Sequence, residues 1–219
     1  MLILYGVHRS RASRPIWLLH EIGMAFDHRP VIQAYRLGNP GAADAPDNTA
    51  SPSFLAVNPL GQIPCMVDGD LVLTESLAIT LYIARRYGGA LGPQDVPEEA
   101  QMMNWTLFAA TAIEAPALDI LMAHGRGEAT TEAGAAEIAA RLETLRRPMS
   151  RLEAHLGERE WMVGGRFTAA DINVAECLRY MQPEPGALLP YPAVADWLAR
   201  CQDRAGFRTM WQARLAEPA

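Results

Sequence analysis

The sequence contains no lysine, so all 19 of its basic side chains are arginines, against 25 aspartates and glutamates. The formal net charge at pH 7 is -6. Nucleic acids and anionic membranes attract proteins through an excess of positive charge. The charge balance therefore excludes both as the main partner of this chain.

Cysteine is also scarce. Cys65, Cys177 and Cys201 are odd in number, lie far apart and show no CxxC or other metal-ligand spacing. Disulfide scaffolds and most zinc sites need several cysteines at short, regular spacings. The sequence therefore predicts neither a disulfide framework nor a metal site, and it fits a reducing compartment such as the cytoplasm.

Long apolar runs are missing as well. A membrane-spanning helix needs roughly 18 consecutive apolar residues. The longest candidate, residues 71–84, is interrupted by Thr74, Glu75 and Ser76. The first residues, MLILYGVHRSR, carry no basic segment ahead of their short apolar run and so do not predict a signal peptide. We expect a cytoplasmic protein without a membrane partner.

Core-forming material is abundant, because 50% of the 219 residues are hydrophobic and only 20% are charged. In the first part, apolar runs predict strands near residues 2–5, 26–32, 63–67 and 71–73, and helices over 13–22 and 75–87. Residues 37–53 read as a long loop. Asp68 and Gly69 predict a hairpin turn, and Thr74 is the expected N-cap of the second helix. A βαβ unit implies that the first two strands are parallel.

The pattern changes beyond residue 92, where only helical stretches follow, roughly over residues 98–123, 132–156, 169–181, 193–203 and 207–215. Thr168 and Asp171 match a capping box, with Phe167 and Ile172 at the positions of a hydrophobic staple. We therefore expect an α/β domain over residues 1–87, a linker over 88–96 and an all-α domain over 97–219.

Three short segments could carry chemistry. The loop after the first strand contains Ser10 and Ser13 ahead of a helix, where a hydroxyl can stabilise an anion or simply cap the helix. Pro64 can open a strand without any further role. Glu75 and Ser76 form either an ordinary acidic helix start or a site for the ammonium and carboxylate of an amino acid. Taken singly, each segment is more often structural.

Taken together and in this order, the segments closely resemble the cytosolic glutathione S-transferases, of a bacterial type with serine or cysteine in the first loop. The resemblance covers essentially the whole chain. Its most specific parts are NPLGQIP (residues 58–64), TES (residues 74–76) and GGRFTAADI (residues 164–172).

This resemblance implies a thioredoxin-like first domain of order βαβαββα and an all-helical second domain. Pro64 would be a cis-proline, and Ile63 would pair by its backbone with the cysteinyl part of glutathione. Gln62, Glu75 and Ser76 would bind the polar ends of the tripeptide. Ser10, itself in contact with glutathione, matches the catalytic position, and Tyr5 is a second candidate for that role.

The implied reaction is attack of the glutathione thiolate on a small hydrophobic electrophile, with glutathione as co-substrate and no metal. A free thiol of pKa near 8.5 is only about 3% ionised at neutral pH, and a hydroxyl donor supplies enough free energy to change that. The electrophile site would be lined by Val7, Leu107, Phe108, Thr111 and Glu114. A role in detoxification and a homodimer are also implied.

Two alternatives stay open at this point. The first is another glutathione-dependent reaction, such as peroxide reduction or isomerisation. The isomerase branch typically carries Ser-Ser-Cys where this chain has Ser10-Arg11-Ala12. The second is a glutathione-binding or regulatory protein that kept the fold and lost catalysis. Relatives of that kind often lose residues equivalent to Gln62, Glu75 and Ser76, which this sequence retains.

Overall fold

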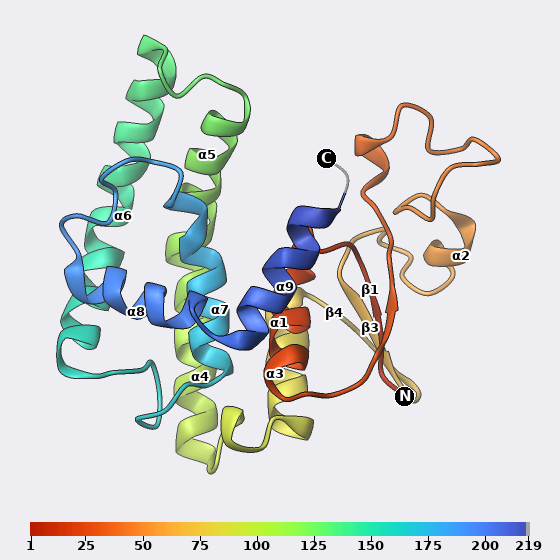
Figure 1. Ribbon diagram of the computed structural model, residues 1–219, viewed down its shortest axis with the longest axis horizontal. Helices are drawn as coiled ribbons and strands as arrows, with labels where there is room; N and C mark the ends of the chain where they lie inside the picture. Colours follow the sequence, from red (N-terminus) through yellow and green to blue (C-terminus); the bar gives the residue numbers. More distant parts are fainter. Residues whose placement is uncertain (218–219) are drawn as a thin grey trace. The chain divides into compact units, whose positions relative to one another are not determined.

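The structure of the chain is a computed structural model that describes residues 1–217 (Figure 1). It divides into two compact units. The first contains Met1–Gly89 together with the residues from Arg204 onward, and the second contains Ala90–Asp203.

The first unit is built on a four-stranded sheet of order β2-β1-β3-β4. Its strands are β1 (Ile3–Tyr5), β2 (Asp27–Arg29), β3 (Cys65–Asp68) and β4 (Leu71–Thr74). Strand β1 pairs parallel to β2 and antiparallel to β3, and β3 pairs antiparallel to β4. The expected parallel pair is confirmed. Strand β2 is shorter than the predicted 26–32, and β3 begins at Cys65 rather than at Ile63.

Helices cover both faces of this sheet. Helices α1 (Ser13–Glu21) and α3 (Ser76–Tyr87) pack together, and the short α2 (Pro52–Leu55) lies on the other side, as Figure 1 shows. Successive strand residues point to opposite faces, so Tyr5 and Cys65 pack with Phe54 of α2. The short 3-10 turn η1 (Ala34–Arg36) follows β2. The element order βαβαββα agrees with the expected thioredoxin-like domain.

The last helix, α9 (Ala205–Ala216), belongs to the first unit and packs along α1 (Figure 1). The Phe207 ring meets the Trp17 ring edge-on at 4.9 Å between centroids. The Arg204 guanidinium lies 2.8 Å from the Glu21 carboxylate. The split between Gly89 and Ala90 falls inside the expected linker over residues 88–96, whereas the residues from Arg204 onward belong to the first unit and not to the expected all-α domain over 97–219. Local sequence periodicity carries no trace of these long-range contacts.

The second unit is all-helical, as expected. It contains α4 (Val96–Phe108), a π-helical turn η3 (Ala109–Ile113), α5 (Glu114–Gly125), α6 (Glu132–Glu158), α7 (Ala169–Leu178) and α8 (Pro192–Gln202), with the 3-10 turns η2 (Gly89–Leu91) at its boundary and η4 (Arg179–Met181) after α7. Helix α7 is buried along its whole length. Pro116 lies inside α5 without ending it, and the wider π turn comes directly before.

Residues 96–125 form one long helical segment whose mean hydropathy reaches 1.4, which is long and apolar enough for a membrane span by composition alone. Core helices of globular proteins have the same composition. Here α4 and the π turn pack on α7, and α5 packs on α6. We therefore interpret the segment as the core helix of the second unit.

Candidate functional site

A cleft of about 480 Å³ lies in the first unit, and we call it the Ser10 cleft. It collects every residue predicted to contact glutathione: Ser10, Gln62, Ile63, Pro64, Glu75 and Ser76. These residues come from the loop after β1, the segment before β3 and the start of α3. The cleft therefore joins three segments that are separate in the sequence.

The Ser10 hydroxyl has two partners within its own loop. It donates to the Val7 carbonyl oxygen at 2.6 Å and accepts from the Ala12 backbone N–H at 3.0 Å. Helix α1 starts three residues later, with Ala12 as N-cap and no side-chain capping bond among the described residues. The Ala12 bond polarises the hydroxyl, which strengthens it as a donor. A bound anion in the cleft would have to draw the hydroxyl proton away from Val7.

The segment before β3 is a tightly bonded turn. The Asn58 side chain accepts from the Leu60 N–H and donates to the Gln62 carbonyl at 2.7 Å. Gly61 has a φ of 60°, and a Cβ there would lie 2.7 Å from the Thr49 carbonyl oxygen. The Ile63–Pro64 peptide bond is cis. The turn thereby presents the backbone of Ile63 and the side chain of Gln62 to the cleft.

Helix α3 begins one residue later than predicted. Glu75, not Thr74, is its N-cap. Its φ of 67° is a backbone conformation that residues other than glycine rarely adopt. Thr74 instead ends β4 and lines the cleft. Ser76 is buried, and its hydroxyl accepts from the buried Arg14 guanidinium at 2.9 Å. The unusual backbone of Glu75 turns the start of α3 toward the cleft.

Tyr5, the second catalytic candidate, lies elsewhere. Its ring is buried against Phe54, and its hydroxyl oxygen accepts from Arg29 Nη1 at 3.1 Å. It is not among the described residues that line the Ser10 cleft. Cys65, which directly follows Pro64 of the cleft, is fully buried, and burial raises the pKa of its thiol. Of the two catalytic candidates, Ser10 lines the cleft and Tyr5 does not.

The residues predicted for the electrophile site are spread over both units. Val7 of the first unit is buried and accepts the Ser10 bond. In the second unit, Leu107 is exposed, and the exposed Thr111 hydroxyl donates to the Leu107 carbonyl. Phe108 packs edge-on against Trp105. Glu114 is buried and accepts from the Cys177 thiol at 3.4 Å.

The cleft also contains residues to which sequence reasoning gave no role in binding: Arg11, Gln33, Tyr35, Thr49, Leu60, Gly61 and Thr74. Leu60, Gly61 and Thr74 belong to the quoted motifs, Thr49 lies in the long loop over residues 37–53 and Arg11 lies in the first loop, so these five had a signal. Gln33 and Tyr35 had none. The Gln33 side chain accepts from Arg36 Nη1 at 3.2 Å.

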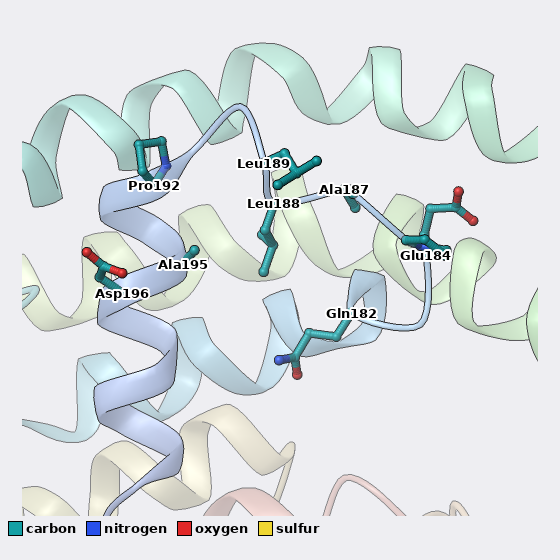
Figure 2. Close-up of a pocket in the computed structure, with 10 residues that line it drawn as sticks. Gln182, Glu184, Ala187, Leu188, Leu189, Pro192, Ala195 and Asp196 are labelled. Carbon is teal, nitrogen blue, oxygen red and sulfur yellow. The ribbon is translucent and has the colours of Figure 1, made fainter.

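A second cleft, also of about 480 Å³, lies within the helical unit (Figure 2). Its wall includes apolar residues of the segment before α8, such as Leu188 and Leu189, and Figure 2 shows the Glu184 and Asp196 carboxylates at opposite sides. The Glu184 carboxylate pairs with His124 at 2.8 Å. No residue singled out from the sequence lines this cleft among those the structure describes. Within residues 1–217, no group of His, Cys, Asp and Glu is placed to hold a metal ion.

Comparison with known proteins gives a consistent result. Residues 1–85 match the family "Glutathione S-transferase, N-terminal domain", and residues 100–205 match "Glutathione S-transferase, C-terminal domain". The chain is 31% identical to glutathione S-transferase 3 of Zea mays over 99% of this chain and 90% of that protein.

Two solved structures are also similar. Glutathione transferase F7 from Populus trichocarpa superposes with a TM-score of 0.79 at 26% identity, over 98% of this chain and 99% of that one. The theta class glutathione S-transferase from Xanthomonas axonopodis pv. citri, solved with glutathione bound, superposes with a TM-score of 0.74 at 29% identity, over 95% of both chains.

Proposed function

Because this chain belongs to the cytosolic glutathione S-transferase family and is a glutathione transferase, we propose that the Ser10 cleft is where it binds glutathione and ionises the thiol. One observation carries the assignment: a single cleft collects Ser10, Gln62, Ile63, Pro64, Glu75 and Ser76. Each had been singled out from the sequence before the fold was known. Their meeting in one place supports a shared ligand.

The two ends of the cleft suit different parts of the tripeptide. Glu75 offers a carboxylate for the α-ammonium of the γ-glutamyl group, and the start of α3 with Ser76 offers donors for its carboxylate. The Ile63 backbone, beside cis-Pro64, suits the peptide unit of the cysteinyl residue. In this proposal the thiol points toward the loop that carries Ser10.

Ser10 then acts as a hydrogen-bond donor to the thiolate. Lowering a thiol pKa of about 8.5 by two units requires about 2.7 kcal/mol. A hydrogen bond to a charged acceptor contributes about 1.5–3 kcal/mol, and the start of α1 adds some tenths to one. The hydroxyl therefore suffices without a general base, provided that its proton turns from the Val7 carbonyl to the sulfur.

The test is Ser10→Ala, with Tyr5→Phe as the matched hydroxyl deletion. We expect Ser10→Ala to lower kcat/KM by about 10- to 100-fold and to raise the kinetic pKa, because one charged hydrogen bond is lost. The dissociation constant for glutathione, measured by calorimetry, should stay nearly constant. Tyr5→Phe should leave the kinetic pKa unchanged. The reverse result would transfer the role to Tyr5.

The reaction class is tested with a substrate panel of an aryl halide, an enone, an isothiocyanate and a hydroperoxide, after retention on glutathione-agarose. Turnover confined to the hydroperoxide would favour a peroxidase, and a conjugated dicarboxylate tests isomerase activity. Retention without any turnover would favour a binding protein. We propose that the electrophile is a small hydrophobic molecule; the exposed side chains of Leu107 and Thr111 suit such contact better than Glu114, which is bonded to Cys177.

A homodimer, a cytoplasmic location and a role in detoxification are further parts of the proposal. Two-fold homodimers are the commonest closed assembly of soluble chains. Light scattering coupled to size exclusion would decide the oligomeric state, and an elution mass of about one chain would overturn the dimer.

A further inference from the structure

The loop that carries Ser10 is contacted by a residue about 200 positions away. Glu217, directly after α9, accepts hydrogen bonds with both carboxylate oxygens. Its Oε1 accepts from the His8 N–H at 2.7 Å and from His8 Nδ1 at 2.8 Å, and its Oε2 accepts from the Arg9 N–H at 2.8 Å. The carboxylate thus bonds the two backbone groups directly before Ser10.

Arg214, in the last turn of α9, adds two bonds to the same stretch. Its guanidinium donates to the His8 carbonyl oxygen, and its own carbonyl accepts from Arg9 Nε at 3.1 Å. Helix α9 is itself anchored on α1 through Arg204 and Glu21. His8 is therefore bonded through both its N–H and its C=O, and Arg9 through its N–H and its side chain, to the last turn of α9 and the residue after it.

The carboxylate is surrounded by compensating groups. His8 and Arg9 bond it from the loop. His28 of β2 meets the His8 ring edge-on at 4.9 Å and is bonded to the Gly6 carbonyl at 2.7 Å. Burial alone would raise the pKa of Glu217, but the bonds from His8 and Arg9 outweigh burial and lower it. Glu217 is thus an ionised acceptor at neutral pH.

These contacts matter because Ser10 has two tasks that compete. In the structure its hydroxyl donates to the Val7 carbonyl and so closes the loop on itself. To stabilise a thiolate, the same proton must leave Val7, and the loop then loses that bond. We propose that Glu217 is a positioning residue for the reaction: its bonds to residues 8 and 9 hold the loop while the Ser10 proton turns to the glutathione sulfur.

This inference rests on the proposed function of Ser10. It concerns the thiol rather than tripeptide affinity, because Gln62, Ile63, Glu75 and Ser76 lie on other segments of the cleft. Removal of Glu217 should therefore separate the two kinetic constants, with a lower kcat, a higher kinetic pKa and a nearly constant KM for glutathione.

The experiment compares Glu217→Ala, Glu217→Gln and Ser10→Ala with the control Arg204→Ala, which breaks an α1–α9 ion pair without touching residues 8 and 9. Each full-length variant is assayed with glutathione and an aryl halide across pH, and the bound thiolate is followed by ultraviolet difference absorbance. Thermal unfolding is measured in parallel, so that a loss of stability is seen directly.

We expect Glu217→Ala to lower kcat/KM by about tenfold and to raise the kinetic pKa by about one unit, the equivalent of one lost hydrogen bond. Glu217→Gln keeps an oxygen that can accept from His8 but places an amide NH2 against the Arg9 N–H. Its kcat/KM and kinetic pKa should lie between those of wild type and Glu217→Ala. Arg204→Ala should leave the kinetic pKa unchanged even where its stability is lower.

Three results would overturn the inference. If Ser10→Ala raises the kinetic pKa and Glu217→Ala does not, the inference fails while the function of Ser10 stands. If Arg204→Ala shifts the kinetic pKa as much as Glu217→Ala, the effect is one of stability and not of positioning. If Ser10→Ala itself changes nothing, the proposed function fails and the inference fails with it.

Discussion

Helices α3 and α7 begin in opposite ways. At α7, Thr168 and Asp171 form a complete capping box, in which Asp171 Oδ2 accepts from the Thr168 N–H at 2.8 Å. At α3, the N-cap Glu75 makes no side-chain capping bond and has a positive φ. The start of α7 is closed by its own residues, and the start of α3 faces the Ser10 cleft.

The two helix starts differ because the start of α7 is buried in the core, whereas the start of α3 lines the Ser10 cleft. A helix leaves its first N–H groups without partners inside the helix, so a buried start must be capped by the protein. Helix α7 is buried along its whole length and satisfies this need locally. At α3 the N-cap side chain makes no such bond, and under the proposed function the carboxylate of the ligand adds an acceptor there, at the cost of the unfavourable backbone of Glu75. We therefore interpret the capped start of α7 as structural and the start of α3 as part of the Ser10 cleft.

The largest effect on the free energy of unfolding is expected from a substitution at the start of α7. Asp171 also accepts from the Met162 N–H at 3.0 Å and from Trp197 Nε1 at 2.9 Å, all within the core. Asp171→Ala leaves these buried donors without an acceptor and should lower the free energy of unfolding by about 3–5 kcal/mol. Urea denaturation measures this, with Thr168→Ser, which keeps the capping hydroxyl, as the near-neutral control. A loss below about 1 kcal/mol would contradict the role of this cap.

At the start of α3, a substitution of Glu75 should change the affinity for glutathione more than the stability. Glu75→Gln keeps the shape of the side chain and removes its charge, so glutathione should bind about tenfold more weakly, with stability unchanged. Glu75→Gly should weaken binding similarly and yet raise the free energy of unfolding by about 0.5–1 kcal/mol, because glycine tolerates a positive φ. Calorimetry and urea denaturation separate the two quantities. Lower stability in Glu75→Gly would show that this start is structural after all.

A third helix start sharpens the comparison through pH. Asp95 accepts from the Glu98 N–H at the start of α4, and Glu98 in turn accepts from the Gln94 N–H. The Arg166 guanidinium bonds, followed by the Gln94 N–H, lower the pKa of Glu98 from 4.5 to about 2. A lowered carboxyl pKa stabilises the folded chain above the unfolded value and loses that effect as the pH falls toward the folded value.

We therefore expect wild type to exceed Glu98→Gln in stability by about 1 kcal/mol above pH 4.5, discounted for partial exposure, and by progressively less as the pH falls toward 2. Urea denaturation of both proteins at several pH values gives this difference directly. A difference that does not change with pH would contradict the assignment of the low pKa to this carboxylate.

Local patterns anticipated much of this architecture. Strand and helix order in the first domain, the hairpin at Asp68 and Gly69 and the capping box at Thr168 all follow from hydrogen bonds and periodicities that span a few residues. Boundaries were less exact: Thr74 was expected to cap α3, and the structure gives that position to Glu75. A preference for threonine as an N-cap cannot show a backbone that only the surrounding fold imposes.

The six predicted glutathione contacts in the Ser10 cleft follow from motifs whose order along the chain is distinctive. Gln33 and Tyr35 of the same cleft do not, because a lone glutamine or tyrosine in a loop carries no pattern. Ser10 is the first catalytic candidate and Tyr5 the second, and the structure places Tyr5 in the core beside Phe54.

The sequence by itself thus determined the elements, their order and the motifs that line the Ser10 cleft, since these depend on contacts between near neighbours in the chain. Only the tertiary structure decided that α9 packs on α1 within the first unit and that Glu217 reaches His8 across 209 positions. The physical reason is that a hydrogen bond depends on distance in space, and two residues so far apart become neighbours only after the core between them has formed.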